Sequence, residues 1–380
     1  MRVKQNRRWR KERLFLISIT ILSLSVAALS AWHTTHLLNT IPRVHARHRV
    51  AVKPAISRNG TATRQLAQAL PATAFSGTAI IVQNGRVIAQ LSRGYADRKT
   101  QQPNTLKTLY EIDSVQKSLT AAMVMRQIQA GKLSMTTKLS RFYPNIPGAN
   151  EITIQHLLDM TSGLSIQGQL VPSRSYGDAA VIANLRPHLR FVAKQLNLWH
   201  YQPANYMLLA GVLAQLDNVS YQELFMATYL QGLGLTQTRF AYAADQTDFA
   251  QGYGWGARGL ADAPQINATV AQQHMELGTG QVMMSALDLY KAEAALQNGQ
   301  LLTVASRAFL FAPGSAATYG GGLYQAPTGY RFANGSGYGF QCFLRISNDG
   351  RSAVVVMANC TPPNALVKNA ADRLATEYVR

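Results

Sequence analysis

The sequence has few cysteines and few acids for its length. Its 380 residues include only two cysteines, Cys342 and Cys360, which excludes a disulfide framework. Both fall near strands expected towards the C-terminus, out of direct register, so their pairing stays open. There are 18 Asp and Glu against 37 Lys and Arg, and the chain shows no internal repeat or low-complexity segment. A chain of this length can bury a large core.

The shortage of acids leaves a positive charge that is concentrated at the N-terminal end. Residues 1–60 contain 12 Lys and Arg and one acid, a charge of +11, whereas the other 320 residues carry +8. Seven of these cations lie within residues 2–13, directly before an apolar run from residue 14 to residue 32. Cations in that position orient a membrane span, and they argue against a nucleic-acid partner.

The apolar run is long enough to cross a bilayer, since its 19 residues extend about 28 Å as a helix. We therefore expect a cytoplasmic basic tail (1–13), a transmembrane signal-anchor (14–32) and an extracellular linker (33–61). These would hold one large domain, residues 62–380, outside a cell membrane that the chain crosses once. A cleaved signal peptide is the alternative, because Ala-Leu-Ser-Ala at residues 28–31 is similar to a processing site.

Histidine is concentrated in the expected linker, where its spacing indicates no metal site. Four of the eight histidines lie between residues 33 and 48, without the ligand spacing of a closed site. We expect neither a metal nor a cofactor.

Strand patterns lie at both ends of the large domain, with helical patterns between them. Two β-branched runs flank Asn84-Gly85, which is a strong hairpin signal, and further strands are predicted near the C-terminus. Residues from about 165 to 300 are expected to be mostly helical. The sequence thus predicts an α/β (α+β) fold, in which an antiparallel sheet flanked by helices is joined to a helical lobe, with a cleft between them. The predicted strands are 77–82, 86–91, 320–323, 339–346 and 353–358, and the predicted helices outside the lobe are 63–70, 114–130, 152–158 and 364–379.

One pair of polar residues at the start of a predicted helix has catalytic potential. Ser114 precedes Lys117 by three residues, so both side chains lie on one helix face. Serine is a poor nucleophile without a base beside it, and a lysine amine can be that base. Asp113 is expected to cap the helix. Because Ser-x-x-Lys also occurs by chance, the assignment depends on the rest of the chain.

Further motifs support the assignment by their order along the chain, and together they resemble the serine β-lactamase-like hydrolases. That family contains penicillin-binding proteins, class C β-lactamases and related esterases, and the resemblance covers about residues 62–378. Its motifs here are Phe75-Ser76-Gly77-Thr78, Gly94-Tyr95-Ala96-Asp97, Ser114 to Thr120, Gly131-Lys132-Leu133-Ser134, Thr161-Ser162-Gly163-Leu164, Tyr201 with Asn205 to Gly211, and Gly278 to Ser285.

The resemblance implies a role for each of these residues. Ser114 would attack an acyl carbonyl and form an acyl-enzyme, Lys117 would act as its base, and Tyr201 would relay protons. The backbone N–H groups of Ser114 and Ser336 would form the oxyanion hole. Contacts to substrate are expected from Gln202, Asn334 and Gly335.

Two departures from the family pattern bear on specificity. Pro203 replaces the asparagine of the family's Tyr-x-Asn motif. Asn205, two residues on, either is structural or takes the place of that asparagine. Ala333 stands where the family's third motif has a cation that binds a substrate carboxylate. Without it, such substrates lose a contact of about 1.5–3 kcal/mol, unless Arg331 or Arg345 points inward.

The favoured function is an esterase that removes D-alanyl esters from teichoic or lipoteichoic acid, which would then be the polymer partner. The membrane tether, the absent cation at 333 and a basic region between residues 164 and 200 motivate it. A peptidoglycan D,D-carboxypeptidase or weak β-lactamase is the first alternative, and a non-catalytic polymer- or partner-binding module is the second. The charged residues of that region are Arg174, Arg186, Arg190 and Lys194, against Asp178.

Overall fold

The computed structural model describes residues 59–172, 177–315 and 317–379. The basic tail, the apolar run and most of the linker expected from the sequence lie outside this part of the chain. Within it, no helix combines the length and the apolar character needed to span a membrane.

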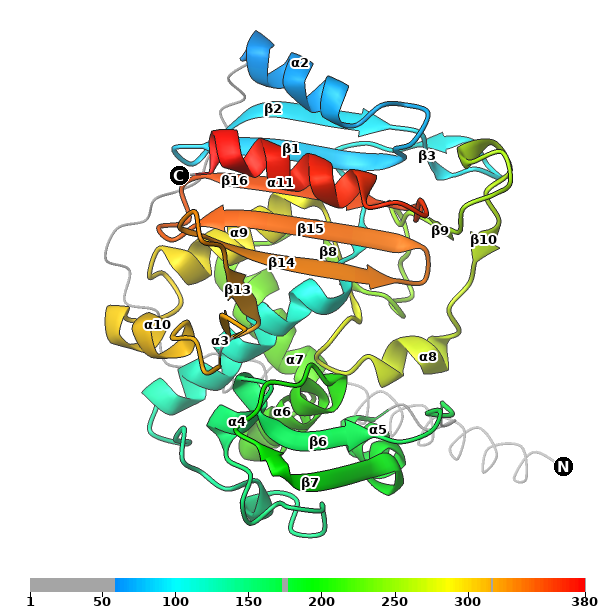
Figure 1. Cartoon of the computed structure of the whole chain (residues 1–380). Coiled ribbons are helices and arrows are strands. Elements are labelled where there is room, and N and C mark those ends of the chain that lie inside the picture. Colours follow the sequence, from blue (N-terminus) through cyan, green and yellow to red (C-terminus); the bar gives the residue numbers. More distant parts are fainter. Residues whose placement is uncertain (1–58, 173–176, 316, 380) are drawn as a thin grey trace, which may run out of the picture. The chain divides into compact units, whose positions relative to one another are not determined.

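A seven-stranded antiparallel sheet forms the centre of the described domain (Figure 1). Strands from the two ends of the chain meet in it, because β1 pairs with β16 and places Ile81 opposite Val354. The predicted antiparallel sheet of distant segments is therefore confirmed. In spatial order the strands are β12 (Tyr319–Gly320), β13 (Leu323–Gln325), β14 (Tyr330–Gly337), β15 (Phe340–Ser347), β16 (Ala353–Ala358), β1 (Gly77–Gln83) and β2 (Arg86–Arg93).

The predicted hairpin at the start of the domain is present. Asn84 and Gly85 link β1 to β2 with φ values of 49° and 75°. Positive φ at both central residues matches the right-handed twist of the two strands, which explains why Asn-Gly occurs there.

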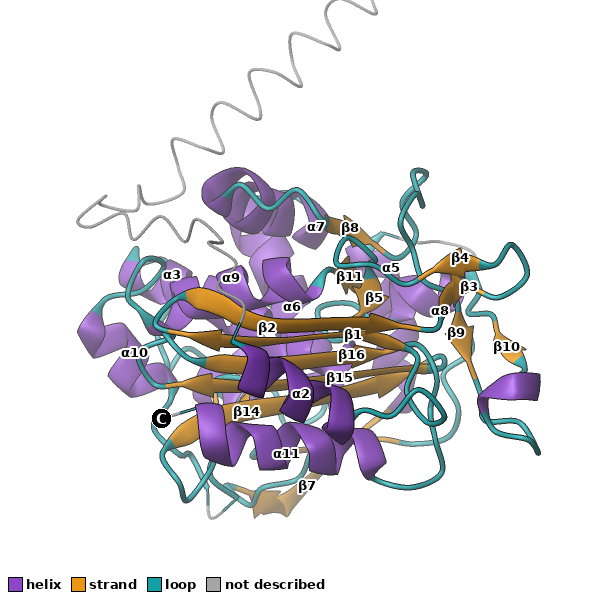
Figure 2. Ribbon diagram, turned by 90° about the horizontal axis from the view of Figure 1, so that it is seen from above, coloured by secondary structure: helices purple, strands orange, loops and turns teal. Residues whose placement is uncertain are grey.

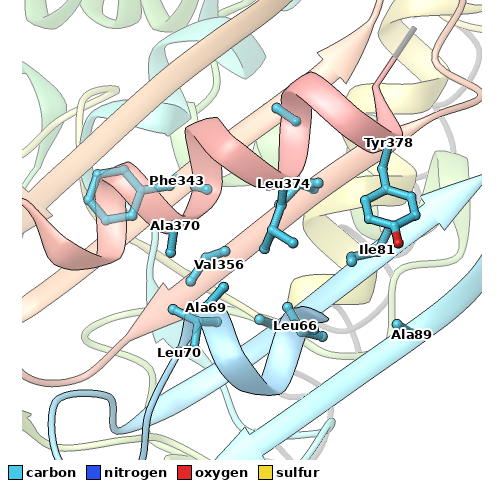
Figure 3. Close-up of a cluster of buried hydrophobic side chains, with 14 of the residues drawn as sticks. Leu66, Ala69, Leu70, Ile81, Ala89, Phe343, Val356, Ala370, Leu374 and Tyr378 are labelled. Carbon is cyan, nitrogen blue, oxygen red and sulfur yellow. The ribbon is translucent and has the colours of Figure 1, made fainter. Parts of the chain in front are cut away.

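Two helices from opposite ends of the chain cover one face of the sheet, α2 (Gly60–Ala69) and α11 (Leu366–Tyr378) (Figure 2). Figure 3 shows Leu66 of α2 and Leu374 of α11 meeting Val356 of the sheet in one apolar cluster. Leu66 and Val356 are fully buried. This cluster joins the first and last described helices across the sheet.

Helices α3 and α9 lie on the other face of the sheet, and the lobe of α4 to α7 continues beyond α3 (Figure 1). The helix α3 thus runs between the sheet and the lobe. The bounds are α3 (Gln116–Gln129), α4 (Ile154–Leu158), α5 (Asp178–Leu185), α6 (Pro203–Asp217), α7 (Tyr221–Phe225), α8 (Val270–Met275), α9 (Ala286–Gln297) and α10 (Val304–Leu310).

The lobe contains more strand than its sequence predicts. Pro187 lies in a short 3-10 turn, after which the chain becomes extended and pairs with β6, placing Arg190 opposite Ser165. Backbone pairing with β6 overrides the local preference of this segment for helix. The strands outside the seven-stranded sheet, in the lobe and elsewhere, are β3 (Tyr95–Asp97), β4 (Gln102–Pro103), β5 (Tyr110–Glu111), β6 (Ser162–Ile166), β7 (Leu189–Leu196), β8 (Thr238–Phe240), β9 (Gly252–Tyr253), β10 (Gln265–Ile266) and β11 (Val282–Met284).

The two cysteines are not bonded to each other. Both thiols are free and buried, and Cys342 lies opposite Met357 in the sheet. Burial raises the pKa of the Cys360 thiol to about 11, so it is un-ionised at neutral pH.

Truncating the apolar cluster should destabilise the domain. We expect Leu66→Ala to lower the free energy of unfolding by about 2–5 kcal/mol, because it leaves a cavity between α2 and the sheet. Leu198→Ala is the matched control, since Leu198 is 59% exposed and should change stability by less than about 0.5 kcal/mol. Urea denaturation of both variants measures this, and equal effects would contradict the proposed core.

Candidate active site

The nucleophile candidate lies in a tight turn rather than in the α-helix itself. Residues Asp113–Val115 form a 3-10 turn, and α3 begins at Gln116. Lys117 Nζ donates a 2.8 Å hydrogen bond to Ser114 Oγ. Lys117 lies in the first turn of α3, three residues after Ser114, and this spacing places the two side chains on one face. Lys117 is only 2% exposed, so this contact is shielded from water.

Asp113 does not cap the helix, contrary to the sequence-based expectation. No side chain caps this turn, and the N-cap position belongs to Ile112. Asp113 has a φ of 46° and is buried, with its carboxyl group directed towards β14. The cap prediction failed because the chain adopts the left-handed conformation one residue before the nucleophile.

Tyr201 joins the serine and lysine from the other side of the cleft. It lies between β7 and α6, and Lys117 Nζ is 5.2 Å from the centre of its ring. Its ring also makes an edge contact with Tyr319 at 6.2 Å. The fold thus brings together Ser114, Lys117 and Tyr201 from separate segments, as an acyl-transfer site requires.

Ser114 and Tyr201 border a cavity of about 490 Å³, and Lys117 lies behind Ser114. Ser114 and Tyr201 line it, as do the predicted oxyanion residue Ser336 and the predicted contacts Asn334 and Gly335. The remaining lining residues are Tyr319, Gly322, Tyr324, Ala333, Gln341, Phe343, Asn364, Ala365 and Lys368.

Two amide oxygens in this cavity have no hydrogen-bond donor. Asn334 Oδ1 and Gln341 Oε1 are both buried and unpartnered among the described residues. An unpaired buried acceptor costs free energy, and a rotation of either side chain that turned its amide towards the cavity would let it meet an N–H or O–H donor.

Neither arginine considered for the missing cation enters the cavity. Arg331 donates to Gln297 at 2.6 Å and stacks over Phe311, where burial lowers the pKa of its guanidinium to about 10. Arg345 is fully buried, and its Nη2 lies 2.7 Å from Asp372 Oδ1.

The cavity gains its cation from another element, α11. Lys368 lines the wall and is held by Asp372 at 2.8 Å. Asp372 also binds Arg345, which donates to the carbonyl of Ala333 at 3.1 Å. Through Arg345, Asp372 of α11 is thus linked to the backbone of β14, the strand that lines the cleft. The sequence did not indicate Lys368, because no motif around a lysine on a C-terminal amphipathic helix shows that its side chain lines a cavity.

The two remaining candidates from the Tyr201 segment make internal contacts. Asn205 is fully buried and accepts from Ser162 Oγ at 2.6 Å, which is a structural role. Gln202 does not line the cavity, and its side chain accepts from the Ile166 N–H at 3.4 Å. Its contact with substrate therefore stays a prediction.

Aromatic rings form one wall at the mouth of the cavity. Tyr319 and Tyr324 pack edge to face at 4.8 Å, and Trp199 contacts Tyr324 at 6.4 Å. Burial raises the pKa of the Tyr324 phenol to about 12, so this wall carries no charge at neutral pH.

Known proteins share both the sequence pattern and this fold. PbpX of Bacillus subtilis (strain 168), which carries the name of a penicillin-binding protein, is 30% identical over 285 residues, or 75% of this chain and 71% of its own. The teichoic acid D-alanine hydrolase of Staphylococcus aureus (strain MRSA252) is 23% identical over 230 residues, or 60% and 56% of the two chains. The crystal structure of FmtA from Staphylococcus aureus superimposes with a TM-score of 0.73 and 20% identity, over 90% of this chain and 97% of FmtA.

The family description Beta-lactamase matches residues 63–377, nearly all of the described domain. A match of this extent, with the Ser-x-x-Lys pair at the mouth of the cavity, defines the family. The chain belongs to the beta-lactamase family of serine hydrolases.

Proposed function

We propose that this protein is an esterase that removes D-alanyl groups from teichoic or lipoteichoic acid through an acyl-enzyme on Ser114. The observation that carries the proposal is the polarity of the cavity. Ala333 leaves position 333 without a charge, two lining residues have an unpaired amide oxygen, and Lys368 on the wall is the one cation among the described lining residues. A D-alanyl ester of a phosphate polymer carries an ammonium group and nearby phosphates, which suit these features.

The chemistry follows from the Ser114–Lys117 contact. In its amine form Lys117 accepts the Ser114 proton while Oγ bonds to the ester carbonyl carbon. The C–O bond to the polymer then breaks, and the polymer hydroxyl leaves with a proton relayed through Tyr201. Water attacks the acyl-enzyme and releases free D-alanine and the serine hydroxyl. The Ser114 and Ser336 N–H groups would stabilise the oxyanion in both steps.

Rotation of the Asn334 or Gln341 side chain towards the cavity would provide the means to recognise the D-alanyl ammonium. Asn334 Oδ1 and Gln341 Oε1 can only accept hydrogen bonds, and an ammonium group can only donate them. A penicillin, whose defining charge is a carboxylate, offers no such match.

Cations on the surface suit the polymer's phosphates. Lys368 can contact a phosphate next to the scissile ester, with Asp372 as its resting partner. Arg186, Arg190 and Lys194 are exposed along the segment that leads to Tyr201, and they can steer a polyanion. Arg174 lies outside the described residues.

The name of one relative agrees with this assignment, since it is a teichoic acid D-alanine hydrolase. We further propose that residues 14–32 anchor the enzyme in the cell membrane with its catalytic domain outside, where such polymers occur. A D,D-carboxypeptidase acting on peptidoglycan is less well supported, because Ala333 and Lys368 place the cation away from the family's usual position.

Removing the nucleophile or its base should abolish turnover. We expect Ser114→Ala to release no D-alanine from purified lipoteichoic acid, and Lys117→Ala to lower the rate by about 10²- to 10⁴-fold. Enzymatic detection of free D-alanine measures both. Release by wild type no faster than by Ser114→Ala would overturn the proposed esterase activity, and a muropeptide substrate tests the carboxypeptidase alternative in parallel.

Removing the cation on the cavity wall should weaken recognition of the polymer alone. We expect Lys368→Ala to lower kcat/KM for D-alanyl lipoteichoic acid by about 5- to 10-fold and to leave a small neutral ester unaffected. Lys132→Ala is the matched control, because Lys132 forms a similar 2.7 Å pair with Asp217 but does not line the cavity. An equal loss on both substrates would show that Lys368 has a structural role only.

A further inference from the structure

The residue before the nucleophile is enclosed by backbone that passes very close to it. Asp113 is 6% exposed and adopts a φ of 46°. A Cβ atom on Gly337 would lie 2.4 Å from Asp113 Oδ1, and one on Gly335 would lie 3.0 Å from Asp113 Cβ. The Asp113 side chain thus fills the narrow space between the nucleophile turn and β14.

This space separates the two backbone groups expected to form the oxyanion hole. Ser114 follows Asp113 directly, and Ser336 lies between the two glycines that contact it. Both serines line the reaction cavity. Whatever fills the gap between turn and strand therefore determines how far apart their N–H groups lie, and an error of about 1 Å in such a distance can cost about 100-fold in rate.

The surroundings of Asp113 disfavour a charge on it. Its Oδ2 has no hydrogen-bond partner, and the acids Glu111 of β5 and Glu276 after α8 lie near it. Lys117 of α3 is the basic group near it, and Tyr338 of the β14–β15 turn and Cys342 of β15 are close enough to interact with it electrostatically.

Burial raises the pKa of the Asp113 carboxyl well above its ordinary range. The two neighbouring acids raise it further, and Lys117 opposes them. Burial and Glu276 likewise raise the pKa of Glu111 to about 8. Burial and the two acids therefore favour the uncharged form of Asp113, and a rise in pH favours its ionisation.

We propose that Asp113 is a positioning residue, which sets the spacing of the Ser114 and Ser336 N–H groups by filling the gap between them as an uncharged carboxyl group. It touches neither substrate nor the reacting atoms, and it acts through the backbone. Its ionisation would place a second negative charge beside the oxyanion and disfavour acylation. Since this role concerns the acylation step itself, it does not depend on which ester is the substrate.

The first test is the rate of covalent labelling of the full chain by a fluorophosphonate probe, in which Ser114 Oγ bonds to phosphorus, fluoride leaves and the serine proton passes to the base. Asp113→Gly removes the spacer yet suits the positive φ, so backbone strain does not confound it. We expect labelling about 10- to 100-fold slower, with Asp113→Asn restoring the rate because asparagine has nearly the same shape. Labelling of the glycine variant at the wild-type rate would overturn the proposal.

The second test distinguishes a role that needs the uncharged carboxyl group from a role that needs only the shape of the side chain. The ratio of the Asp113→Asn rate to the wild-type rate should rise with pH, because only wild type acquires a charge at this position as the pH increases. Asp217→Asn, a change at a carboxyl that pairs with Lys132 and does not line the cavity, is the control and should give a constant ratio. A constant ratio for Asp113→Asn as well would overturn the proposal, even if the glycine variant fails to fold.

Discussion

β14 crosses the turn before Ser114 at a separation that only glycine allows at positions 335 and 337. A Cβ atom on Gly335 would lie 2.2 Å from the carbonyl oxygen of Ile112. This contact fixes β14 against the 3-10 turn that leads into α3, and α3 in turn carries the helical lobe (Figure 1). The cleft, the nucleophile and the cleft strand all take their positions from it.

The catalytic groups and the groups that would recognise a substrate come from different parts of the chain. The pair Ser114 and Lys117 is local, since three residues and one tight turn bring the two groups together. Recognition comes from distant segments: the amides from β14 and β15, the aromatic wall from β12 and β13, and the cation from α11. The second set can change without disturbing the first, which explains how one family supports hydrolases of different substrates.

Much of the fold could be predicted from the sequence, because its signals are local. Asn84-Gly85 indicated the β1–β2 hairpin, and the helices predicted at 114–130 and 364–379 correspond to α3 and α11. The strand β7 was missed, since only its pairing with β6 makes it extended. The sequence also could not show whether the Arg345 side chain points into the cleft, because its orientation depends on an ion pair with Asp372 of a separate helix.

The site was predictable where it rests on short motifs and not where it rests on tertiary contacts. Ser114 and Tyr201 do line one cavity, and Lys117 contacts both of them. Lys368 could not be found, because it lies more than 200 residues from the nucleophile and within an ordinary amphipathic helix. The burial of Asp113 was equally hidden, since an aspartate at a helix start ordinarily caps it.

The central claim is that an intact acyl-transfer site has exchanged carboxylate recognition for recognition of a D-alanyl ester. Mass spectrometry of the protein, quenched during turnover and digested, tests this most directly. We expect the peptide that contains Ser114 to gain the mass of one D-alanyl group, and this adduct should form faster from a D-alanyl ester than the corresponding penicillin adduct. Faster acylation by penicillin, or a D-alanyl group on any other residue, would contradict it.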